Sequence, residues 1–266
     1  MKRIGLILAV AGLTVTSVVG QQRETRAVSG FTGIEASSVF DITVSKGDAE
    51  SLLIEADSDI MPFVRAEVRD GVLHLFIDNS WKQKSVKTLR ASVVMRSLDK
   101  VTLSGASKIA VIDLFAADDF SVKCSGTSQL KLHLNVKQLN VSASGACKIH
   151  ISGHASENLW IDVSGTTNFQ GELRANTVMF NSSGVSSVYL SGSATDIIVN
   201  ASGTSRINAE NFAVKTAIVN SAGTSKIIVN VEDSMIVNSA GASSVNYKGS
   251  PAIQTFSSGT SKIRGM

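Results

Sequence analysis

The residues of this chain that could do chemistry are a few carboxylates, four histidines and two cysteines. Enzymes that cleave glycans need paired carboxylates, or a calcium-binding cluster of Asp and Glu, on neighbouring elements. Asp118 and Asp119 are adjacent in sequence, but their segment predicts a return loop with a solvated turn. Asp162 stands where the equivalent segments carry Ser142 and Asn181 instead of a second carboxylate. The carboxylates therefore do not predict a catalytic pair.

The histidines have no spacing that is typical of a metal site. They are His74, His133, His150 and His154, and only the last two lie close together, in what we expect to be a loop. A nucleophile elbow, a phosphate-binding loop and a Cys–His arrangement are also missing from the sequence. We therefore assign no catalytic, metal-binding or cofactor-binding residues, and we expect a protein that is not an enzyme and needs no cofactor.

Basic residues recur at one position of a repeat. Lys108, Lys148, Arg206, Lys226 and Lys262 each lie three residues after a repeat glycine, where other segments carry Gln129, Asn168, Ser187 and Ser244. Such a stripe could contact an anionic glycan or a cell surface, or it could be a soluble outer face that discourages aggregation between strands. We favour the second interpretation. The net charge of +3 is too small and too evenly mixed to predict nucleic-acid binding.

The repeat itself fills more than half of the chain. Nine Ser-Gly or Ala-Gly dipeptides recur at intervals of 18 to 21 residues, and an apolar residue follows four residues after each glycine. The glycines are Gly105, Gly126, Gly145, Gly165, Gly184, Gly203, Gly223, Gly241 and Gly259. Apolar residues alternate beside them, as in Leu159, Ile161 and Val163, which is the period of a β-strand. The sequence predicts an all-β parallel β-helix of about nine coils, each coil being one turn of the solenoid.

Stacking of coils explains the most conspicuous small and polar residues. Glycine is needed where the backbone takes a positive φ or closely approaches the next coil, and the Ser or Thr beside it can hydrogen-bond to the turn. Asn181, Asn200, Asn220 and Asn238 each lie three residues before a glycine, so their amides can stack as a ladder. The first two also begin glycosylation sequons, which we interpret as by-products of the ladder.

Residues 1–20 have the pattern of a secretory signal peptide. Two basic residues precede an apolar run from Ile4 to about Val15, and small residues end at Gly20. The run is shorter than the roughly 18 to 20 residues that a membrane-spanning helix needs. We predict export to the periplasm, the outer-membrane surface or the extracellular space, with no transmembrane segment in the mature chain.

Export would permit a disulfide between the two cysteines, Cys124 and Cys147. They occupy different positions of the repeat, so we do not expect them to be stacked neighbours. Buried free thiols are the interpretation that the spacing favours.

Residues 26–100 lack the glycine repeat but still alternate like strands, with a hairpin signal at Asp70-Gly71 between apolar runs. Because the open strand edges of a solenoid invite pairing with other chains, this β-rich region is expected to cover the first coil. We expect it to be continuous with the repeat stack at residues 101–266.

Segments of this region carry a resemblance to a known family. FTGIE at 31–35, DITVSKGD at 41–48, IEADSDIMPFV at 54–64 and DGVLHLFI at 70–77 resemble the N-terminal module of the bacterial family called putative autotransporter adhesin, head GIN domain. The pattern L-x-x-V-x-L-S-G-A-S-K-I at 98–109, with its repeats, is similar to the C-terminal stack of that family. The resemblance implies a right-handed parallel β-helix with a β-rich N-terminal portion, in exported proteins common among Bacteroidetes. It implies no catalytic residues.

The function favoured by these observations is an exported, non-enzymatic, adhesin-like or binding scaffold of the cell envelope, with a cell-surface or glycan ligand. A glycan-active enzyme, either a polysaccharide lyase or a hydrolase, is the alternative, and a purely structural envelope protein is a third possibility. Because the sequence shows no cap after its ninth repeat, we also expect another subunit or a partner to cover the last coil, for example in a homo-oligomer.

Overall fold

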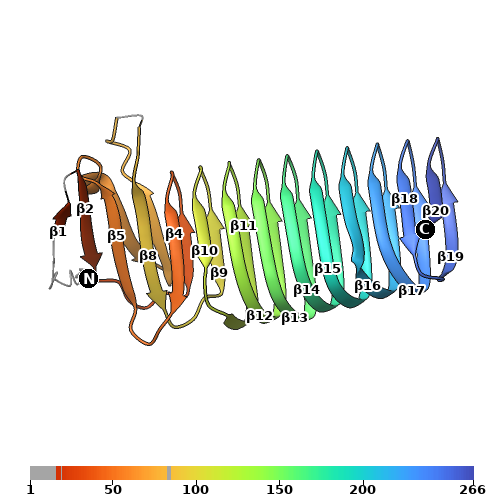
Figure 1. Cartoon of the computed structure of the whole chain (residues 1–266), viewed down its shortest axis with the longest axis horizontal. Coiled ribbons are helices and arrows are strands. Elements are labelled where there is room, and N and C mark those ends of the chain that lie inside the picture. Colours follow the sequence, from red (N-terminus) through yellow and green to blue (C-terminus); the bar gives the residue numbers. More distant parts are fainter. Residues whose placement is uncertain (1–15, 19, 83–84) are drawn as a thin grey trace, which may run out of the picture.

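The computed structural model describes residues 16–18, 20–82 and 85–266, which form an elongated parallel β-helix (Figure 1). The predicted signal segment falls mostly outside the described residues; of it, β1 (Thr16–Val18) pairs antiparallel with β2 (Gln21–Arg26). The solenoid has about nine turns, which confirms the fold class predicted from the repeat. The one helical segment among the described residues is the 3-10 helix η1 (Met61–Phe63).

Each coil consists of strand on both sides of a sharp glycine corner. The strands are β9 (Lys100–Leu103), β10 (Lys108–Val111), β11 (Phe115–Cys124), β12 (Gln129–Ala143), β13 (Lys148–Val163), β14 (Asn168–Ser182), β15 (Ser187–Ala201), β16 (Arg206–Ser221), β17 (Lys226–Ser239), β18 (Ser244–Lys248), β19 (Ala252–Ser257) and β20 (Lys262–Gly265). Each long strand from β12 to β17 starts after one corner, bends around the rounded end of the coil and finishes at the next corner. The corners form the pointed upper edge in Figure 1.

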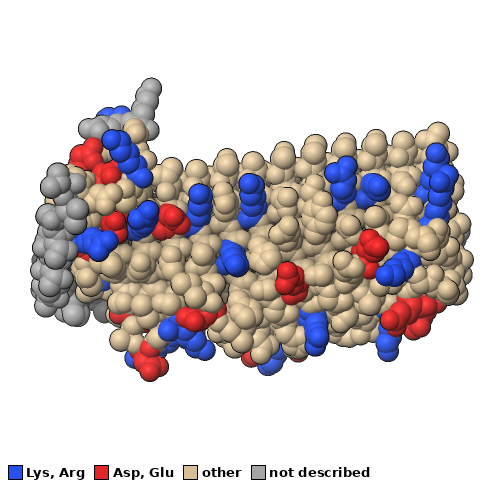
Figure 2. Space-filling view, in the orientation of Figure 1, with Lys and Arg blue, Asp and Glu red and all other residues tan. Residues whose placement is uncertain are grey.

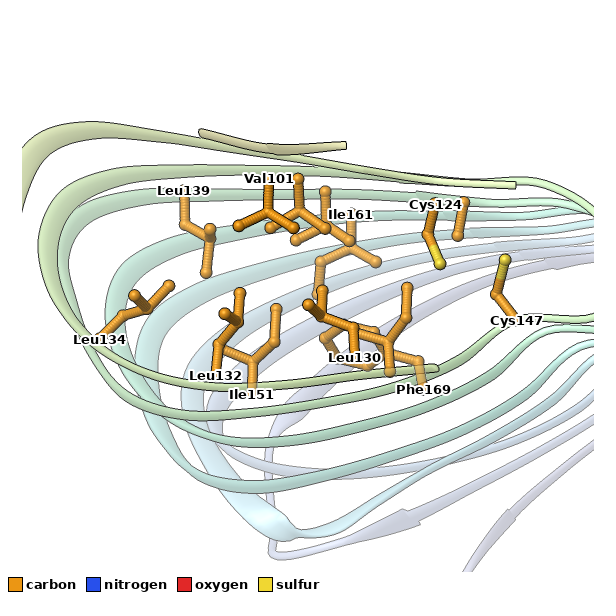
Figure 3. Packing of buried hydrophobic residues seen from close by; sticks show 14 of the residues in the cluster. Val101, Cys124, Leu130, Leu132, Leu134, Leu139, Cys147, Ile151, Ile161 and Phe169 are labelled. Carbon is orange, nitrogen blue, oxygen red and sulfur yellow. The ribbon is translucent and has the colours of Figure 1, made fainter. Parts of the chain in front are cut away.

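Equivalent residues of successive coils lie in register, so each repeat position becomes a column along the helix axis. Ile109 pairs with Leu130, and Leu130 pairs with Ile149. All three are at most 3% exposed. Figure 3 shows that buried side chains from strands after the corner, such as Leu132 and Ile151, face side chains from strands before the corner. The core thus consists of two facing apolar layers. Burial of each large apolar side chain in it contributes roughly 1.5–3 kcal/mol to the stability of the fold.

The corner is where the backbones of neighbouring coils come closest. Gly184 has a φ of 79°, and a Cβ atom at this position would lie 2.8 Å from the carbonyl oxygen of Gly165 in the preceding coil. The residue two positions after each glycine turns its side chain into the corner, and Ser205 Oγ donates a hydrogen bond of 2.9 Å to the Ser202 carbonyl. The expected positive φ is confirmed, and so is the hydroxyl that bonds the turn, except at Ser107, whose buried hydroxyl has no hydrogen-bond partner among the described residues.

One further corner precedes the nine that the glycines mark. Ser38 has a φ of 75°, and its carbonyl accepts a hydrogen bond of 2.7 Å from the backbone N–H of Ala106. The strands on either side of it, β3 (Gly33–Ala36) and β4 (Asp41–Lys46), pair in parallel with β9 and β10. The stack therefore extends one coil further toward the N-terminus than the glycine pattern indicates, because a serine occupies the glycine position there.

Beyond this coil the parallel ladders end in antiparallel strands. The strands β7 (Val72–Ile77) and β8 (Leu89–Met95) pair in parallel with β3 and β4. Their outer edges pair antiparallel with β6 (Val64–Arg69) and β5 (Ser51–Asp57), and β5 pairs antiparallel with β2. The hairpin predicted at Asp70-Gly71 joins β6 to β7, with φ values of 49° and 72°. The coil edges on this side are therefore occupied by the chain itself.

Two alanine substitutions separate the role of the close approach from that of the positive φ. Gly71 has a φ of 72°, and a Cβ atom added there would have no atom of the described residues within 4 Å apart from its chain neighbours. Gly71→Ala should therefore lower the free energy of unfolding by about 1 kcal/mol, because alanine disfavours the left-handed backbone. Gly184→Ala should cost roughly 1–3 kcal/mol more, because the new Cβ forces two coils apart. Denaturant midpoints of both variants test this, and equal losses would contradict the proposed role of the coil contact.

Candidate functional site

The carboxylates that the sequence singled out remain apart. Asp162 lies in register between Ser142 and Asn181, as predicted. The return loop predicted at Asp118 and Asp119 is wrong: both residues belong to β11, because parallel pairing continues around the rounded end of the coil. The Asp118 carboxylate lies 2.9 Å from Lys137 Nζ in an exposed ion pair. The hydrogen bond with Asp118 raises the pKa of Lys137, and this charge pairing does not form a catalytic centre.

The histidines also remain apart. His150 and His154 both belong to β13, so the loop predicted for them is wrong for the same reason. His150 Nδ1 lies 3.3 Å from Gln170 Oε1, and His74 Nδ1 lies 3.7 Å from a Glu35 carboxylate oxygen. Within residues 16–18, 20–82 and 85–266, no three His, Cys, Asp or Glu side chains come together as a metal-binding group. In the same part of the chain, no helix is long and apolar enough to cross a membrane.

The asparagine ladder forms as predicted. Asn200 Nδ2 donates to Asn181 Oδ1 over 2.8 Å, Asn220 donates to Asn200 over 2.7 Å, and Asn238 donates to Asn220 over 2.8 Å. A primary amide has two N–H donors and an oxygen with two lone pairs. Each amide inside the ladder therefore keeps one N–H and one lone pair that the ladder does not use.

A groove of about 790 Å³ runs along this ladder. It is lined by the asparagines and by the Ser and Ala residues next to the corner glycines, including Ser202 and Ala222. Asp162 lies at one end of the groove and Phe256, which is 63% exposed, at the other. Asp162 is the one charged residue among those that line it. The groove therefore combines unused amide groups with an almost uncharged wall.

An apolar row borders the asparagines on the side away from the corner. Trp160, Met179, Ile198, Ile218 and Ile236 lie in register two residues before the ladder column. Trp160, Ile218 and Ile236 are each 37% exposed. We call the apolar row, the asparagine ladder and the groove together the ladder face. The sequence analysis missed the apolar row, although apolar residues at the outward positions of a half-buried strand are the signal that could have revealed it.

The basic stripe lies on the other strand layer, after the corner. Register pairing places Lys108, Lys148, Arg206, Lys226 and Lys262 in one column with the polar residues predicted to interrupt it. Figure 2 shows Lys and Arg side chains spaced along the upper part of one face, with Asp and Glu side chains among them. Asp41 continues the column beyond Lys108. The ladder face and the stripe are thus two distinct surfaces of the same stack.

The ladder should contribute to stability in proportion to the bonds that each residue makes. Asn200→Ala removes two ladder hydrogen bonds and Asn238→Ala removes one, so we expect losses of about 1–2 and about 0.5–1 kcal/mol. Denaturant midpoints measure both. Losses that do not differ between the two sites would show that the amides are held by something other than the ladder.

Comparisons with known proteins place this geometry in a family. The chain matches the family model described as "Putative auto-transporter adhesin, head GIN domain" over residues 30–171 and 154–251. No curated protein matches the chain in sequence.

Several solved structures share the fold. A putative adhesin from Parabacteroides merdae ATCC 43184 has 17% identity and a TM-score of 0.74, with 93% of this chain and 96% of that chain covered. A putative adhesin from Parabacteroides distasonis ATCC 8503 has 19% identity and a TM-score of 0.71, with 92% and 97% covered. A putative lipid binding protein from the latter organism has 16% identity and a TM-score of 0.69, with 93% and 97% covered. At these identities the likeness shows the fold alone. Since the family model accounts for most of the chain, the chain belongs to the putative auto-transporter adhesin, head GIN domain family.

Proposed function

We propose that the protein is an exported, adhesin-like binding scaffold of the bacterial envelope, and that its ladder face binds an extended neutral polysaccharide. Membership in a family described as adhesins supports the general role. The pattern of residues 1–20 supports export. The observation that carries the choice of ligand is the regular array of unused amide donors and acceptors inside a groove.

The spacing of the array suits a chain of sugars. Coils stack about 4.8 Å apart, so one amide donor and one amide acceptor recur at that interval. A sugar hydroxyl both donates and accepts, and one sugar unit of an extended β-linked chain is close in length to the coil spacing. Same-side groups of an extended peptide recur roughly every 6.7 Å and would lose register within a few coils. The ladder therefore favours a polysaccharide over a peptide strand.

The borders of the ladder suit the same ligand. Sugar rings have apolar C–H faces that can pack on aromatic and aliphatic side chains, and Trp160, Ile218 and Phe256 expose such surface beside the amides. No Lys or Arg is among the residues that line the groove, so an anionic chain would find no counter-charge there. Each sugar unit would contribute little binding free energy, but contacts repeated over several coils can sum to a useful affinity.

The groove supports binding rather than cleavage. Hydrolysis of a glycosidic bond by the common mechanisms requires two carboxyl groups that flank the bond. Asp162, at one end of the groove, has no second carboxylate among the lining residues. A glycan-active enzyme remains the alternative to be tested by turnover.

Retention of the protein on polysaccharides tests this proposal. The wild-type chain should be retained in affinity electrophoresis by one or more neutral β-linked polysaccharides, without release of sugar. Asn200→Asp with Asn220→Asp removes amide N–H donors and adds charge to the groove, so retention should weaken about tenfold or more, as expected for the loss of one or two hydrogen bonds. Trp160→Ala, which leaves the ladder intact, should also weaken retention.

A matched control carries the same charge change on the other strand layer. Asn168→Asp with Asn246→Asp should leave retention unchanged, and circular dichroism should show that all variants are folded. Equal retention of the wild type and both ladder-face variants would overturn the proposed site. Selective binding to acidic polysaccharides or to lipid vesicles would overturn the proposed ligand, and release of sugar would overturn the non-enzymatic role.

A further inference from the structure

The two cysteines face each other across the inside of a corner. Cys124 lies two residues before Gly126, and Cys147 lies two residues after Gly145, the glycine of the next coil. Both are free in the structure and buried, at 3% and 1% exposure. Figure 3 shows their sulfur atoms pointing toward one another from opposite strand layers. They are in different columns, as the sequence predicted, but in contact between adjacent coils.

A pair of serines shows what distance the fold imposes on these two positions. Ser182 and Ser205 stand in the same relation to Gly184 and Gly203 as the cysteines do to their own glycines. Their hydroxyl oxygens are 2.9 Å apart, in a buried hydrogen bond between adjacent coils. The geometry of the corner therefore brings the side-chain atoms at these positions into contact between adjacent coils, as a disulfide requires of its two cysteines.

The environment of the pair also favours reaction of one thiol. The hydrogen bond with Cys124 lowers the pKa of Cys147 to about 7, whereas the same interaction and burial raise the pKa of Cys124. The Cys147 thiol donates to the Ser144 carbonyl over 3.2 Å, which holds the side chain in the corner. Since the thiolate is the form that attacks a disulfide, Cys147 is the better nucleophile of the two.

We propose that Cys124 and Cys147 form a disulfide that links two adjacent coils. The oxidant is a small-molecule disulfide or a disulfide of an oxidoreductase. The Cys147 thiolate attacks one sulfur of the oxidant, so that a mixed disulfide forms and one thiol leaves. Cys124 then gives up its proton and attacks Cys147 Sγ, and the second thiol leaves. The protein loses two electrons and two protons, and the oxidant is reduced to two thiols.

The disulfide would oppose the separation of two adjacent coils of the solenoid. Coils contact only their neighbours, so two coils can separate without disturbing the interfaces between the others. A covalent link between adjacent coils opposes that separation and restricts the unfolded chain. Because both thiols are buried once the coils have stacked, the oxidant is expected to reach Cys147 late in folding or during a local opening of the corner, when Cys124 already lies beside it.

Thiol accessibility after refolding tests the proposal. The full chain is refolded with oxidised glutathione, then denatured and treated with an alkylating reagent. We expect neither cysteine to be alkylated, the mass to fall by two hydrogen atoms, and digestion to release one peptide pair that contains Cys124 and Cys147. Two alkylated thiols, or a bond between two chains, would overturn the proposal. Cys147→Ser, which should fold, is the control that leaves Cys124 without an intramolecular partner.

A second measurement tests whether the disulfide, once formed, stabilises the stacked coils. Reduction should lower the thermal midpoint of the oxidised wild type by several degrees. Cys124→Ser with Cys147→Ser recreates the pair seen at Ser182 and Ser205, so it should fold and its midpoint should not respond to reductant. Equal midpoints for oxidised and reduced wild type would overturn the stabilising role. These results do not depend on whether the ladder face binds polysaccharide, so the two proposals can fail separately.

Discussion

The close approach of backbone to backbone at the glycine corner is the constraint on which this structure depends. At Gly184 a Cβ atom would lie 2.8 Å from the carbonyl of Gly165, so the coils can reach the spacing of parallel strands there because Gly184 has no side chain. Once the corners are stacked, every other position of the coil falls into register with its equivalents. The buried serine or threonine after the glycine completes the corner by bonding the turn, as Ser205 does with Ser202.

This register divides the residues of each coil into two kinds. Inward columns such as Ile109, Leu130 and Ile149 must be apolar, because they build the two facing layers of the core. Outward columns can carry many residue types, and a residue type that recurs in one column forms a continuous row along the helix axis. A single asparagine on one coil would be an ordinary surface residue; four in register form a hydrogen-bonded array beside a groove. Surface properties of this protein are therefore properties of columns, and a binding function of the ladder face would depend on their length.

Features that repeat with the coil were predicted correctly from the sequence: the asparagine ladder, the column of basic residues and the inward columns. Outside the repeat, a local turn signal predicted the hairpin at Asp70-Gly71. The prediction failed where a short polar segment was interpreted as a loop, at Asp118 and Asp119 and again at His150 and His154. In a solenoid the strand continues around the bend because a neighbouring coil offers pairing partners there, so polar residues do not end it. The exposed apolar row from Trp160 to Ile236 was not predicted from the sequence.

The sequence by itself determined the fold class and the order of the columns, because the spacing of nine glycines allows only one register between coils. The tertiary structure alone decided two things. It showed that Ser38 makes a corner without glycine: the serine takes the left-handed conformation and its carbonyl accepts a hydrogen bond from Ala106 of the next coil. It also brought Cys124 to Cys147, because the two residues belong to different columns and meet only when opposite layers of adjacent coils close over the core. Register along a column can be counted in a sequence, but contact across the interior depends on the shape of the coil.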